Sequence, residues 1–487
     1  MLRSAYRLLV GEAARQTDSK VLIPSRHKKT QGQQQRGEFV RFIMTSSVQS
    51  ALKTVADNKL LVAHFIVISH EKTWTVFLTK LERVGDDPLE FVEIPNDLKN
   101  YGRSSLGLVK GGVSDTLISA IQADEGALTT YLEEQTLPIP EGEPEMLSPD
   151  RVEFVLMRDE NDAWKLSLRW DHRSKVWACS TLLPDTSPGS ERLAPESKVL
   201  ASTTVAIVGL GSAGSKIAVS LARTGVGQFI LIDDDLLHPG NLVRHDCDWS
   251  QIGQHKVDAI GSRLALINPR VEVTRHCVRL VGQESATTIA TAISSLSRAL
   301  VIIDATANPT VFNMCAHVAR QSHRSLVWLE VYAGGLGGLV ARARPDRDPE
   351  PFTLRQAIND AAGRIASIKD VEPPQAGTDY DIEQDNQPPI IATDAEVSII
   401  ANLASQFVVD TLIEREPSRF PNPAYLVGLQ RQWIFDQPLQ VFPVESSETG
   451  SWSSTPTDDD PMREGGIEFV QQLILDLIDR DNDHSAS

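Results

Sequence analysis

An apolar segment that runs directly into a glycine series is the feature that most constrains the fold of this chain. Val205 to Val208 read V-A-I-V, and Gly209, Gly211 and Gly214 follow in the pattern G-x-G-x-x-G. Glycine lets the backbone turn tightly, approach a phosphate and pack the next helix closely onto the strand. The segment therefore predicts a strand, a loop and a helix whose N-terminus faces a nucleotide.

A second apolar strand predicts where the ribose of that nucleotide binds. Phe229 to Ile232 are apolar, and Asp233 follows them. It lies roughly 20 residues after Gly214, the spacing typical of a ribose-binding carboxylate. Asp235 is a further carboxylate at the same strand end. The glycines alone favour a nicotinamide or flavin dinucleotide over ATP.

An amide and two cations shortly after Asp233 favour a triphosphate instead. Asn241, Arg244 and Lys256 follow within one loop and the start of one helix. A dinucleotide pyrophosphate needs one helix N-terminus, whereas a triphosphate that loses pyrophosphate needs positive charge on the leaving group. Solvated surface charge is the alternative interpretation of Arg244 and Lys256, but their order and spacing favour a catalytic role.

Five sequence elements in this order resemble the adenylation domain of the ThiF, MoeB and ubiquitin-activating enzyme superfamily. Within residues 190–345 they read G-x-G-x-x-G, D-x-D, N-x-x-R, G-x-x-K and D-x-T-x-N, the last being Asp304 to Asn308. The resemblance implies a Rossmann-like α/β adenylation domain that uses ATP and Mg²⁺. Among bacterial proteins, it extends to the ubiquitin-like activating enzymes of antiphage conjugation operons.

The resemblance also implies a role for each site residue. It assigns nucleotide binding to Gly209, Gly211, Gly214, Asp233 and Asp235, and catalysis to Asn241, Arg244 and Lys256. Asp233 would hold the ribose, Asn241 and Arg244 would meet the triphosphate, and Lys256 would stabilise the attack on the α-phosphate. The implied reaction is adenylation of the C-terminal glycine carboxylate of a ubiquitin-like protein or sulfur carrier.

Ala307 is a first departure from the superfamily pattern. Most members have an aspartate there that binds Mg²⁺, and an alanine cannot coordinate a hard cation. Asp304 is therefore the expected metal residue, with Asp234 or Asp235 as alternatives acting through water. A site that binds nucleotide without turnover is the other interpretation.

A second departure concerns sulfur. Ubiquitin-activating enzymes pass the acyl group to a cysteine on a crossover loop, expected here at residues 364–393, which contain no cysteine. Replacement of that cysteine by Ala376 or Ala392 is an alternative explanation. The chain's four cysteines are Cys179, Cys247, Cys277 and Cys315. Isolated cysteines of this kind are usually buried and inert, and Cys247 is the nearest to the site if one reacts.

Composition limits the class of protein. A chain of 487 residues predicts two or three domains. It has no apolar run of bilayer length, and its net charge of −18 disfavours a nucleic-acid partner. The cysteines form no CxxC pair, which disfavours disulfides and zinc. We therefore expect a cytoplasmic enzyme that binds neither a membrane nor nucleic acid.

The chain divides into four expected segments. Residues 1–44 are polar and basic and predict a disordered leader, with Met44 as an alternative start. A transit peptide is disfavoured by Glu12, Asp18 and Glu38. Residues 45–198 predict an α+β domain, either accessory or inactive-adenylation-like. Residues 199–445 form the expected adenylation domain with its crossover loop, and 446–487 an acidic linker and a C-terminal docking helix.

The expected elements of the α+β domain carry no catalytic constellation. Strands are predicted at 60–69, 74–81, 152–157, 164–170 and 176–180, and helices at 48–56 and 113–135. Arg192 lies just before the strand that precedes the glycine loop, and it is the arginine that such a domain could lend to the active site.

Four features follow the nucleotide-binding segment. The glycines of 334–338 are expected either where a partner's tail pairs with a strand or at a simple bulge. Thr393 and Glu396 predict a capping box that opens an apolar helix through Leu412. Residues 425–442 are expected to close the domain, and the apolar face of 467–478 predicts a helix that docks on its own fold or on a partner.

The sequence thus predicts a ubiquitin-like protein activating enzyme. Its expected partners are a ubiquitin-like protein and a conjugating enzyme, and the resemblance allows a homodimer. The alternatives are a nucleotide-binding scaffold that holds a ubiquitin-like protein without adenylating it and, less favoured, an NAD-dependent oxidoreductase.

Overall fold

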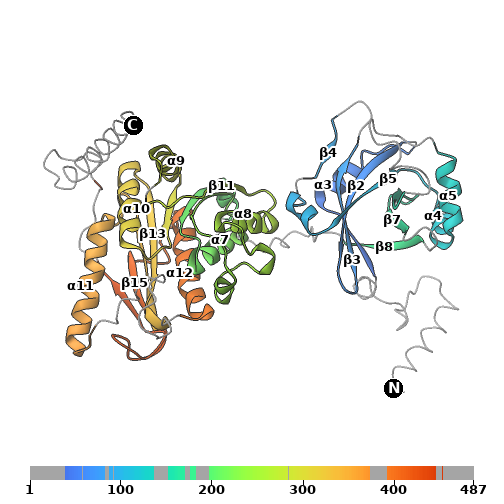
Figure 1. Ribbon diagram of the computed structural model, residues 1–487. Helices are drawn as coiled ribbons and strands as arrows, with labels where there is room; N and C mark the ends of the chain where they lie inside the picture. Colours follow the sequence, from blue (N-terminus) through green and yellow to red (C-terminus); the bar gives the residue numbers. More distant parts are fainter. Residues whose placement is uncertain are drawn as a thin grey trace, which may run out of the picture. The chain divides into compact units, whose positions relative to one another are not determined.

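The structure of the chain is a computed structural model with two compact units, Met1–Arg192 and Leu193–Ser487. It describes residues 39–57, 59–82, 87–91, 93–135, 152–169, 176–182, 197–282, 284–372, 392–445 and 452. Each unit contains one eight-stranded sheet (Figure 1).

The sheet of the N-terminal unit closes into a barrel. Its strands are β1 (Val40–Ile43), β2 (Leu60–Ser69), β3 (Trp74–Leu81), β4 (Leu89–Glu90), β5 (Arg103–Lys110), β6 (Phe154–Arg158), β7 (Trp164–Arg169) and β8 (Val176–Leu182). They follow the order β1-β8-β7-β6-β5-β2-β3-β4, and β1 also pairs with β3 in parallel. The pairing of β1 on both sides removes the free edges of the ring.

Alternate side chains of the barrel strands fill two separate cores. Phe42, Phe65 and Phe154 lie in the first core, where the rings of Phe65 and Phe154 stack with centroids 5.0 Å apart. The helix α3 (Ser46–Leu52), capped by Thr45, adds Val48 to this core. The second core lies beneath α4 (Asp115–Ala123) and α5 (Glu125–Glu133), and a 3₁₀ helix η1 (Asn96–Asn100) precedes β5.

Three expectations for this unit need correction. Residues 40–43, placed in the leader 1–44, form β1 because Val40 and Phe42 are buried in the barrel. The helix expected over 113–135 is two helices, since Asp124 caps α5 by accepting a hydrogen bond from the Gly126 amide at 3.0 Å. The described strands make a barrel and no open nucleotide-type sheet, so the inactive-adenylation-like interpretation is wrong.

The sheet of the C-terminal unit is open and mostly parallel. Its strands are β9 (Thr204–Val208), β10 (Gln228–Ile232), β11 (Glu272–His276), β12 (Val301–Asp304), β13 (Ser325–Val331), β14 (Gly337–Ala343), β15 (Ala424–Gly428) and β16 (Val441–Val444). Their order is β11-β10-β9-β12-β13-β14-β15-β16. The first five strands in this order are parallel, whereas β14, β15 and β16 are joined by antiparallel pairing.

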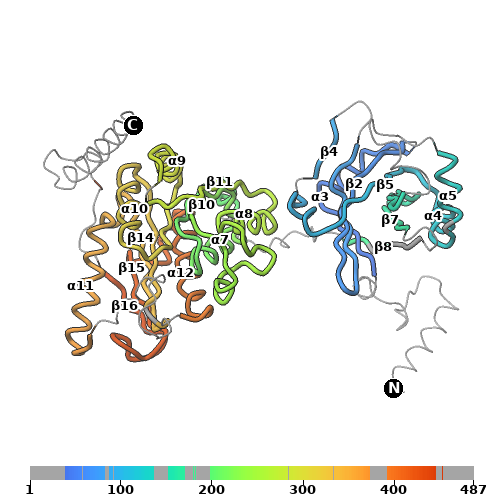
Figure 2. The backbone as a smooth tube through the Cα atoms, viewed as in Figure 1, coloured from blue at the N-terminus to red at the C-terminus, as the bar shows by residue number. Residues whose placement is uncertain are grey.

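Helices cover both faces of this sheet (Figures 1 and 2). One face carries α7 (Ser212–Thr224), α8 (Lys256–Ile267) and α12 (Asp394–Leu412), and the other carries α9 (Ala286–Leu296), α10 (Pro309–Ser322) and α11 (Pro351–Lys369). The short helices are α6 (Ser197–Leu200), η2 (Pro239–Val243), η3 (Trp249–Gln251) and η4 (Ala333–Gly335). Among the described helices, none has the length and apolar character that a membrane crossing requires.

β9 is the strand at which the direction of winding reverses. Val205 and Ile207 point into the core on one face and Ala206 and Val208 into the core on the other, so the strand is buried on both sides. The chain proceeds from β9 to β10 and β11 in one direction and then returns to β12 on the other side of β9. Such a reversal opens a crevice at the carboxyl ends of the strands. The predicted Rossmann-like α/β fold is confirmed.

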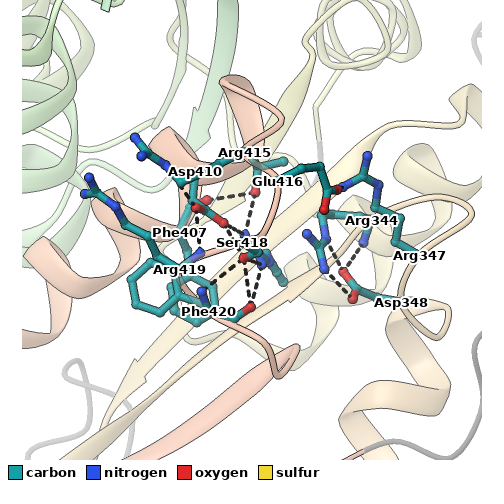
Figure 3. A network of polar contacts seen from close by, with 12 residues as sticks. Arg344, Arg347, Asp348, Phe407, Asp410, Arg415, Glu416, Ser418, Arg419 and Phe420 are labelled. Atoms are coloured by element: carbon teal, nitrogen blue, oxygen red, sulfur yellow. Dashed lines mark hydrogen bonds and ion pairs between the residues drawn. The ribbon is translucent and has the colours of Figure 1, made fainter. Parts of the chain in front are cut away.

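A buried ion pair fixes β14 to the C-terminal end of α12 (Figure 3). Arg342 is fully buried and donates to Asp410 at 2.8 Å, to Ser418 Oγ at 2.8 Å and to the Phe420 carbonyl at 2.9 Å. Its guanidinium carbon lies 5.2 Å from the ring centre of Phe407. The buried charge of Arg342 is thus paired with that of Asp410, as burial requires.

The capping box of α12 occurs as predicted, and the crossover loop begins later than predicted. The carboxylate of Glu396 accepts from the Thr393 amide at 2.7 Å, and α12 ends at Leu412. α11 continues through Lys369, so the segment placed at 364–393 is helical at its start. Residues 373–391 and the linker and docking helix at 446–487, except Trp452, lie outside the described residues, as does Arg192.

The glycines of 334–338 do not expose a strand edge to a partner. β14 is paired with β13 on one side and with β15 on the other. A side chain at Gly337 would lie 2.4 Å from the Val427 carbonyl oxygen, and one at Gly338 would lie 2.6 Å from that of Glu330. These glycines permit close strand packing within the sheet, and the expected pairing of a partner's tail with β14 is wrong.

Candidate functional site

The three glycines that follow β9, two in the loop and one inside α7, have different roles in the structure. Gly209 has a φ of +83° and donates its amide to the Ile232 carbonyl at 2.9 Å. A Cβ at Gly214 would lie 1.9 Å from the Gly209 carbonyl oxygen, so only glycine lets α7 approach the loop. No atom lies within 4 Å of a Cβ built at Gly211, which caps α7. Gly209 therefore serves the turn and Gly214 the packing, whereas Gly211 leaves room for a ligand.

Asp233 lies at the end of β10 and holds the glycine loop. Its carboxylate accepts from the Leu210 amide at 2.6 Å and from the Asp235 amide at 2.9 Å. Burial raises the pKa of Asp233, although these two hydrogen bonds and the charge of Lys256 oppose the rise. The residue predicted to bind ribose therefore also ties β10 to the loop after β9.

Lys256 is a buried cation at the first position of α8. Only 10% of its side chain is exposed, and its Nζ lies 2.5 Å from Asp235 Oδ2. The Lys256 amide donates to the Asp235 carbonyl at 2.9 Å. Burial acts to raise the pKa of Asp235, but the hydrogen bond and the charge of Lys256 outweigh it and hold that pKa below its usual value. In this structure Asp235 is the counter-ion of Lys256.

Asn241 and Arg244 lie on the 3₁₀ helix η2 and at its end. Asn241 Oδ1 accepts from the His238 amide at 2.8 Å, which caps η2. The Arg244 amide donates to the Asn241 carbonyl at 3.1 Å, and the Arg244 side chain is half-buried. The fold thus brings the N-x-x-R segment to the strand end that carries Asp233 and Asp235.

Asp304 lies on the other side of β9, at the end of β12. It is 3% exposed, and one carboxylate oxygen accepts from the Thr306 amide at 3.0 Å and from the Thr306 hydroxyl at 2.6 Å. Burial raises the pKa of Asp304, opposed by the bonds from Thr306 and by the charge of Arg355. A side chain at Gly209 would lie 2.7 Å from Thr306 Cγ2, so the ends of β9 and β12 are in contact.

The carboxylates at this edge do not form a preassembled magnesium site. Asp235 is bound to Lys256, and Asp234 lies 3.0 Å from Arg279. Within the part of the chain that the structure describes, no group of three or more His, Cys, Asp or Glu side chains is arranged to hold a metal. Ala307 is exposed and has a φ of +53°, a conformation that aspartate and asparagine adopt more readily than alanine.

Cys247, the thiol expected to lie nearest the site if one reacts, has the properties of a buried structural cysteine. Cys247 is buried, and that burial raises the pKa of its thiol to about 12, with only partial compensation by the charge of Arg263. Cys315 is completely buried. Cys277 is exposed, and its Sγ lies 3.0 Å from His255 Nδ1 at the carboxyl end of β11.

Two residues at this edge carry no signal in the sequence motifs. His245 directly follows Arg244 and is buried against the glycine loop, with Nε2 2.8 Å from the Leu210 carbonyl oxygen. Lys216, in the first turns of α7, lies 2.5 Å from Asp394 at the start of α12 and has a side chain that is 10% exposed. Both contacts are tertiary, which explains why no local pattern reveals them.

All the predicted site residues lie at one edge of the sheet. The glycine loop, Asp233, Asp235 and Lys256 are joined by direct hydrogen bonds, and Asn241, Arg244 and Asp304 lie on the adjoining segments. Chemically, the edge offers open backbone at a helix N-terminus, a carboxylate at the end of β10 and cations. That combination suits a nucleoside triphosphate.

Comparison with known proteins agrees with this geometry. Residues 191–358 match the ThiF family. The chain contains a ThiF family domain. The match begins just before α6 and ends within α11, so it includes β9 to β14 and every predicted site residue.

Two curated relatives match parts of this chain. A tRNA threonylcarbamoyladenosine dehydratase of Bacillus subtilis is 43% identical over 77 residues, which is 16% of this chain and 30% of the relative. A ubiquitin-like modifier-activating enzyme 5 of Caenorhabditis elegans is 33% identical over 112 residues, 22% of this chain and 27% of the relative. The chain thus spans less than a third of the length of these relatives.

Solved structures show a weaker likeness. MccB of E. coli with ATP is 15% identical, with a TM-score of 0.38, over 51% of this chain and 65% of MccB. PaaA is 19% identical, with a TM-score of 0.40, over 51% of this chain and 75% of PaaA.

Proposed function

We propose that this chain is an ATP-dependent adenylating enzyme that activates the C-terminal glycine carboxylate of a ubiquitin-like protein for transfer to a conjugating enzyme. The position of Lys256 supports the proposal most directly, because its buried ammonium pairs with Asp235 at the strand end whose Asp233 holds the glycine loop. The ThiF domain and the relatives named ubiquitin-like modifier-activating enzyme 5 agree with it. A cytoplasmic location and a homodimer remain part of the proposal.

In the proposed reaction, a carboxylate oxygen of the partner attacks the α-phosphorus of ATP. The bond from that phosphorus to the bridging oxygen breaks, pyrophosphate leaves, and an acyl-adenylate forms. Backbone amides at the start of α7 hold the phosphates, and Asp233 accepts from the ribose hydroxyls. Lys256 turns from Asp235 towards the phosphates and stabilises the charge that develops in the transition state.

Arg244 and Asn241 complete the cationic side of the site by contacting the departing pyrophosphate. A magnesium ion bound with the nucleotide would neutralise phosphate charge and would need only one or two protein carboxylates. Asp304 is the proposed protein contact, because its buried carboxylate lies at the end of β12, which is in contact with the glycine loop.

The test is partner-dependent exchange of labelled pyrophosphate into ATP. Lys256→Ala should lower the exchange about 10²-fold, the scale seen when one transition-state charge stabiliser is removed. Lys165→Ala is the matched control, since Lys165 is also paired with a buried aspartate, Asp159 at 2.9 Å, but belongs to the barrel. Measurable NAD binding without ATP binding would instead favour an oxidoreductase.

Ala307 supports a second candidate, a scaffold that binds ATP and the ubiquitin-like protein without adenylation. Such a chain would bind ATP in calorimetry and show no exchange. Ala307→Asp restores a carboxylate at a position whose φ of +53° suits aspartate. Under the scaffold hypothesis, exchange should appear only in this variant. Exchange by the unmodified chain would contradict it.

A further inference from the structure

Leu210, the residue between the first two glycines, is held from both sides by hydrogen bonds. Its amide donates to Asp233 Oδ2 at 2.6 Å, and its carbonyl accepts from His245 Nε2 at 2.8 Å. Asp233 comes from β10, whereas His245 comes from the segment that carries Arg244. Two parts of the nucleotide edge therefore meet at one residue of the loop.

The hydrogen bonds of His245 define a single tautomer of its ring. Nδ1 lies 3.2 Å from the Cys247 amide, which can only donate, so Nδ1 is unprotonated. The proton must then be on Nε2, where it is donated to Leu210. His245 is 6% exposed, and burial lowers its pKa to about 4.

The charges around His245 also bear on its protonation. Lys256 from α8 and Lys216 from α7 oppose a second proton, while Asp246 and the Leu210 carbonyl favour it. The net effect is a neutral ring throughout the physiological pH range. A neutral donor can hold the carbonyl without adding another cation beside Lys216 and Lys256.

The segment around His245 is bound to the helices on both sides. The Asp246 amide donates to Ser215 Oγ of α7 at 3.3 Å. Arg263 of α8 donates to Asp246 Oδ2 at 2.7 Å. The backbone that follows Arg244 is therefore fixed to α7 and α8 as well as to the glycine loop.

We propose that His245 is a positioning residue that holds the glycine loop and Arg244 in one fixed arrangement, so that both contact the same triphosphate. This inference rests on the proposed function of the site. It assigns to His245 a role through Leu210 and Arg244, with no contact to the nucleotide. Preorganised donors of this kind act on binding as well as on chemistry.

Two substitutions separate the hydrogen bonds of the ring. His245→Gln keeps an N–H near the position of Nε2, and His245→Asn keeps only an acceptor near that of Nδ1. In calorimetry on the full chain, Asn should weaken ATP binding about tenfold, because the buried Leu210 carbonyl loses its donor. The ATP affinity of His245→Gln should stay within about twofold of that of the unmodified chain.

Hydrogen exchange of the loop amides gives a second readout that needs no nucleotide. The amides of Leu210 and Gly211 should exchange faster in His245→Asn than in the unmodified chain, and His245→Gln should restore their protection. Equal exchange and equal ATP affinity in all three proteins would overturn the proposal. The proposal would also be overturned if His245→Gln and His245→Asn lost ATP affinity and amide protection equally and had equally lowered melting temperatures.

The two readouts also separate this inference from the proposed function. An unmodified chain with no affinity for ATP would contradict the proposed function and the role of His245 towards the triphosphate. The exchange data would still decide whether His245 holds Leu210.

Discussion

The two eight-stranded sheets of this chain differ in closure: one is open with functional groups at its strand ends, and the other is closed into a barrel. In the C-terminal unit, β9, β10 and β12 are parallel, and the glycine loop, Asp233 and Asp304 lie at their carboxyl ends along one edge. In the N-terminal unit, β1 pairs with both β3 and β8, so the strands close into a barrel. Parallel strands that end together gather functional groups from distant parts of the sequence. Closure instead favours a packed interior.

A buried aspartate in each sheet shows the same contrast. Asp159 in the barrel unit has a side chain 3% exposed, and Lys165 lies 2.9 Å away. Burial acts to raise the pKa of Asp159, but Lys165 and the amides of Ala163 and Asn161 bring it below its usual value. The pKa of Asp304 stays raised because burial dominates there. Incomplete compensation of a buried charge is typical of functional sites.

The largest effect on stability should come from the network of Figure 3. Arg342→Met leaves Asp410 buried without its main partner, which should lower the free energy of unfolding of the C-terminal unit by about 3–5 kcal/mol. Denaturant unfolding followed by tryptophan fluorescence measures this. In the barrel, Arg103→Met breaks a pair whose side chains are 50% and 35% exposed. It should cost about 1 kcal/mol or less.

A double variant sharpens this prediction. Arg342→Met with Asp410→Leu removes both charges and should recover part of the loss. ATP affinity should not change, because Asp410 lies 16 residues along α12 from Asp394, which meets Lys216, or about 24 Å. A double variant as unstable as the single one would show that the hydrogen bonds to Ser418 and Phe420, and not the charge, dominate.

The next effect concerns Asp233, whose proposed ribose contact exists in both the ground state and the transition state. Asp233→Ala should raise the KM for ATP about tenfold and change kcat less. Asp234→Ala is the matched control, since Asp234 is the next residue and pairs with the exposed Arg279. If turnover falls while KM is unchanged, the ribose assignment is wrong.

The two buried aspartates should respond oppositely to pH. The raised folded-state pKa of Asp304 means that its ionisation destabilises the fold as pH rises through the unfolded-state pKa. Asp304→Asn should therefore stabilise the C-terminal unit at pH 7 and lose this advantage near pH 4. Asp159, whose folded-state pKa is lowered, stabilises the barrel above its unfolded-state pKa and less as pH falls.

Melting temperatures of the two asparagine variants between pH 4 and 8 test this contrast. Asp159→Asn should destabilise the barrel at pH 7, with a loss that shrinks towards acid. An Asp304→Asn protein that is stabilised but less active would indicate that the carboxylate is retained for function. Equal pH dependence of the two variants would remove the distinction between the sheets.

The sequence predicts only part of the difference between the two sheets. The part that it predicts depends on local signals. The glycine loop, the strand ends and the capping box of Thr393 depend on residues close in sequence, and the structure has them at the expected positions. The strands Leu60–Ser69 and Trp74–Leu81 also match, because the first is a nearly continuous apolar run and the second alternates over most of its length.

The remaining features depend on contacts between distant residues. β5 escaped prediction because its sequence R-S-S-L-G-L-V-K begins with polar residues and contains Gly107. Barrel closure needs the parallel pairing of Val40 with Trp74, which no local pattern encodes. The same holds for the bond from His245 to Leu210 and for the burial of Cys247, which only the folded chain defines.

The smallest effect should come from the thiols. Cys277 is exposed, so iodoacetamide should label it in the folded chain, whereas Cys247 and Cys315 should react only after unfolding. Burial, and then the charges of Asp258 and Asp234, raise the pKa of the Cys277 thiol. Its labelling should therefore be slower than that of a peptide thiol at neutral pH and should accelerate as pH rises, because the thiolate is the nucleophile.

Cys277→Ser should abolish this labelling and leave pyrophosphate exchange within about twofold, since no step of the proposed adenylation uses a thiol. Mass spectrometry of the labelled peptides decides the order, and early labelling of Cys247 would show that the segment bound to the glycine loop opens in the native state.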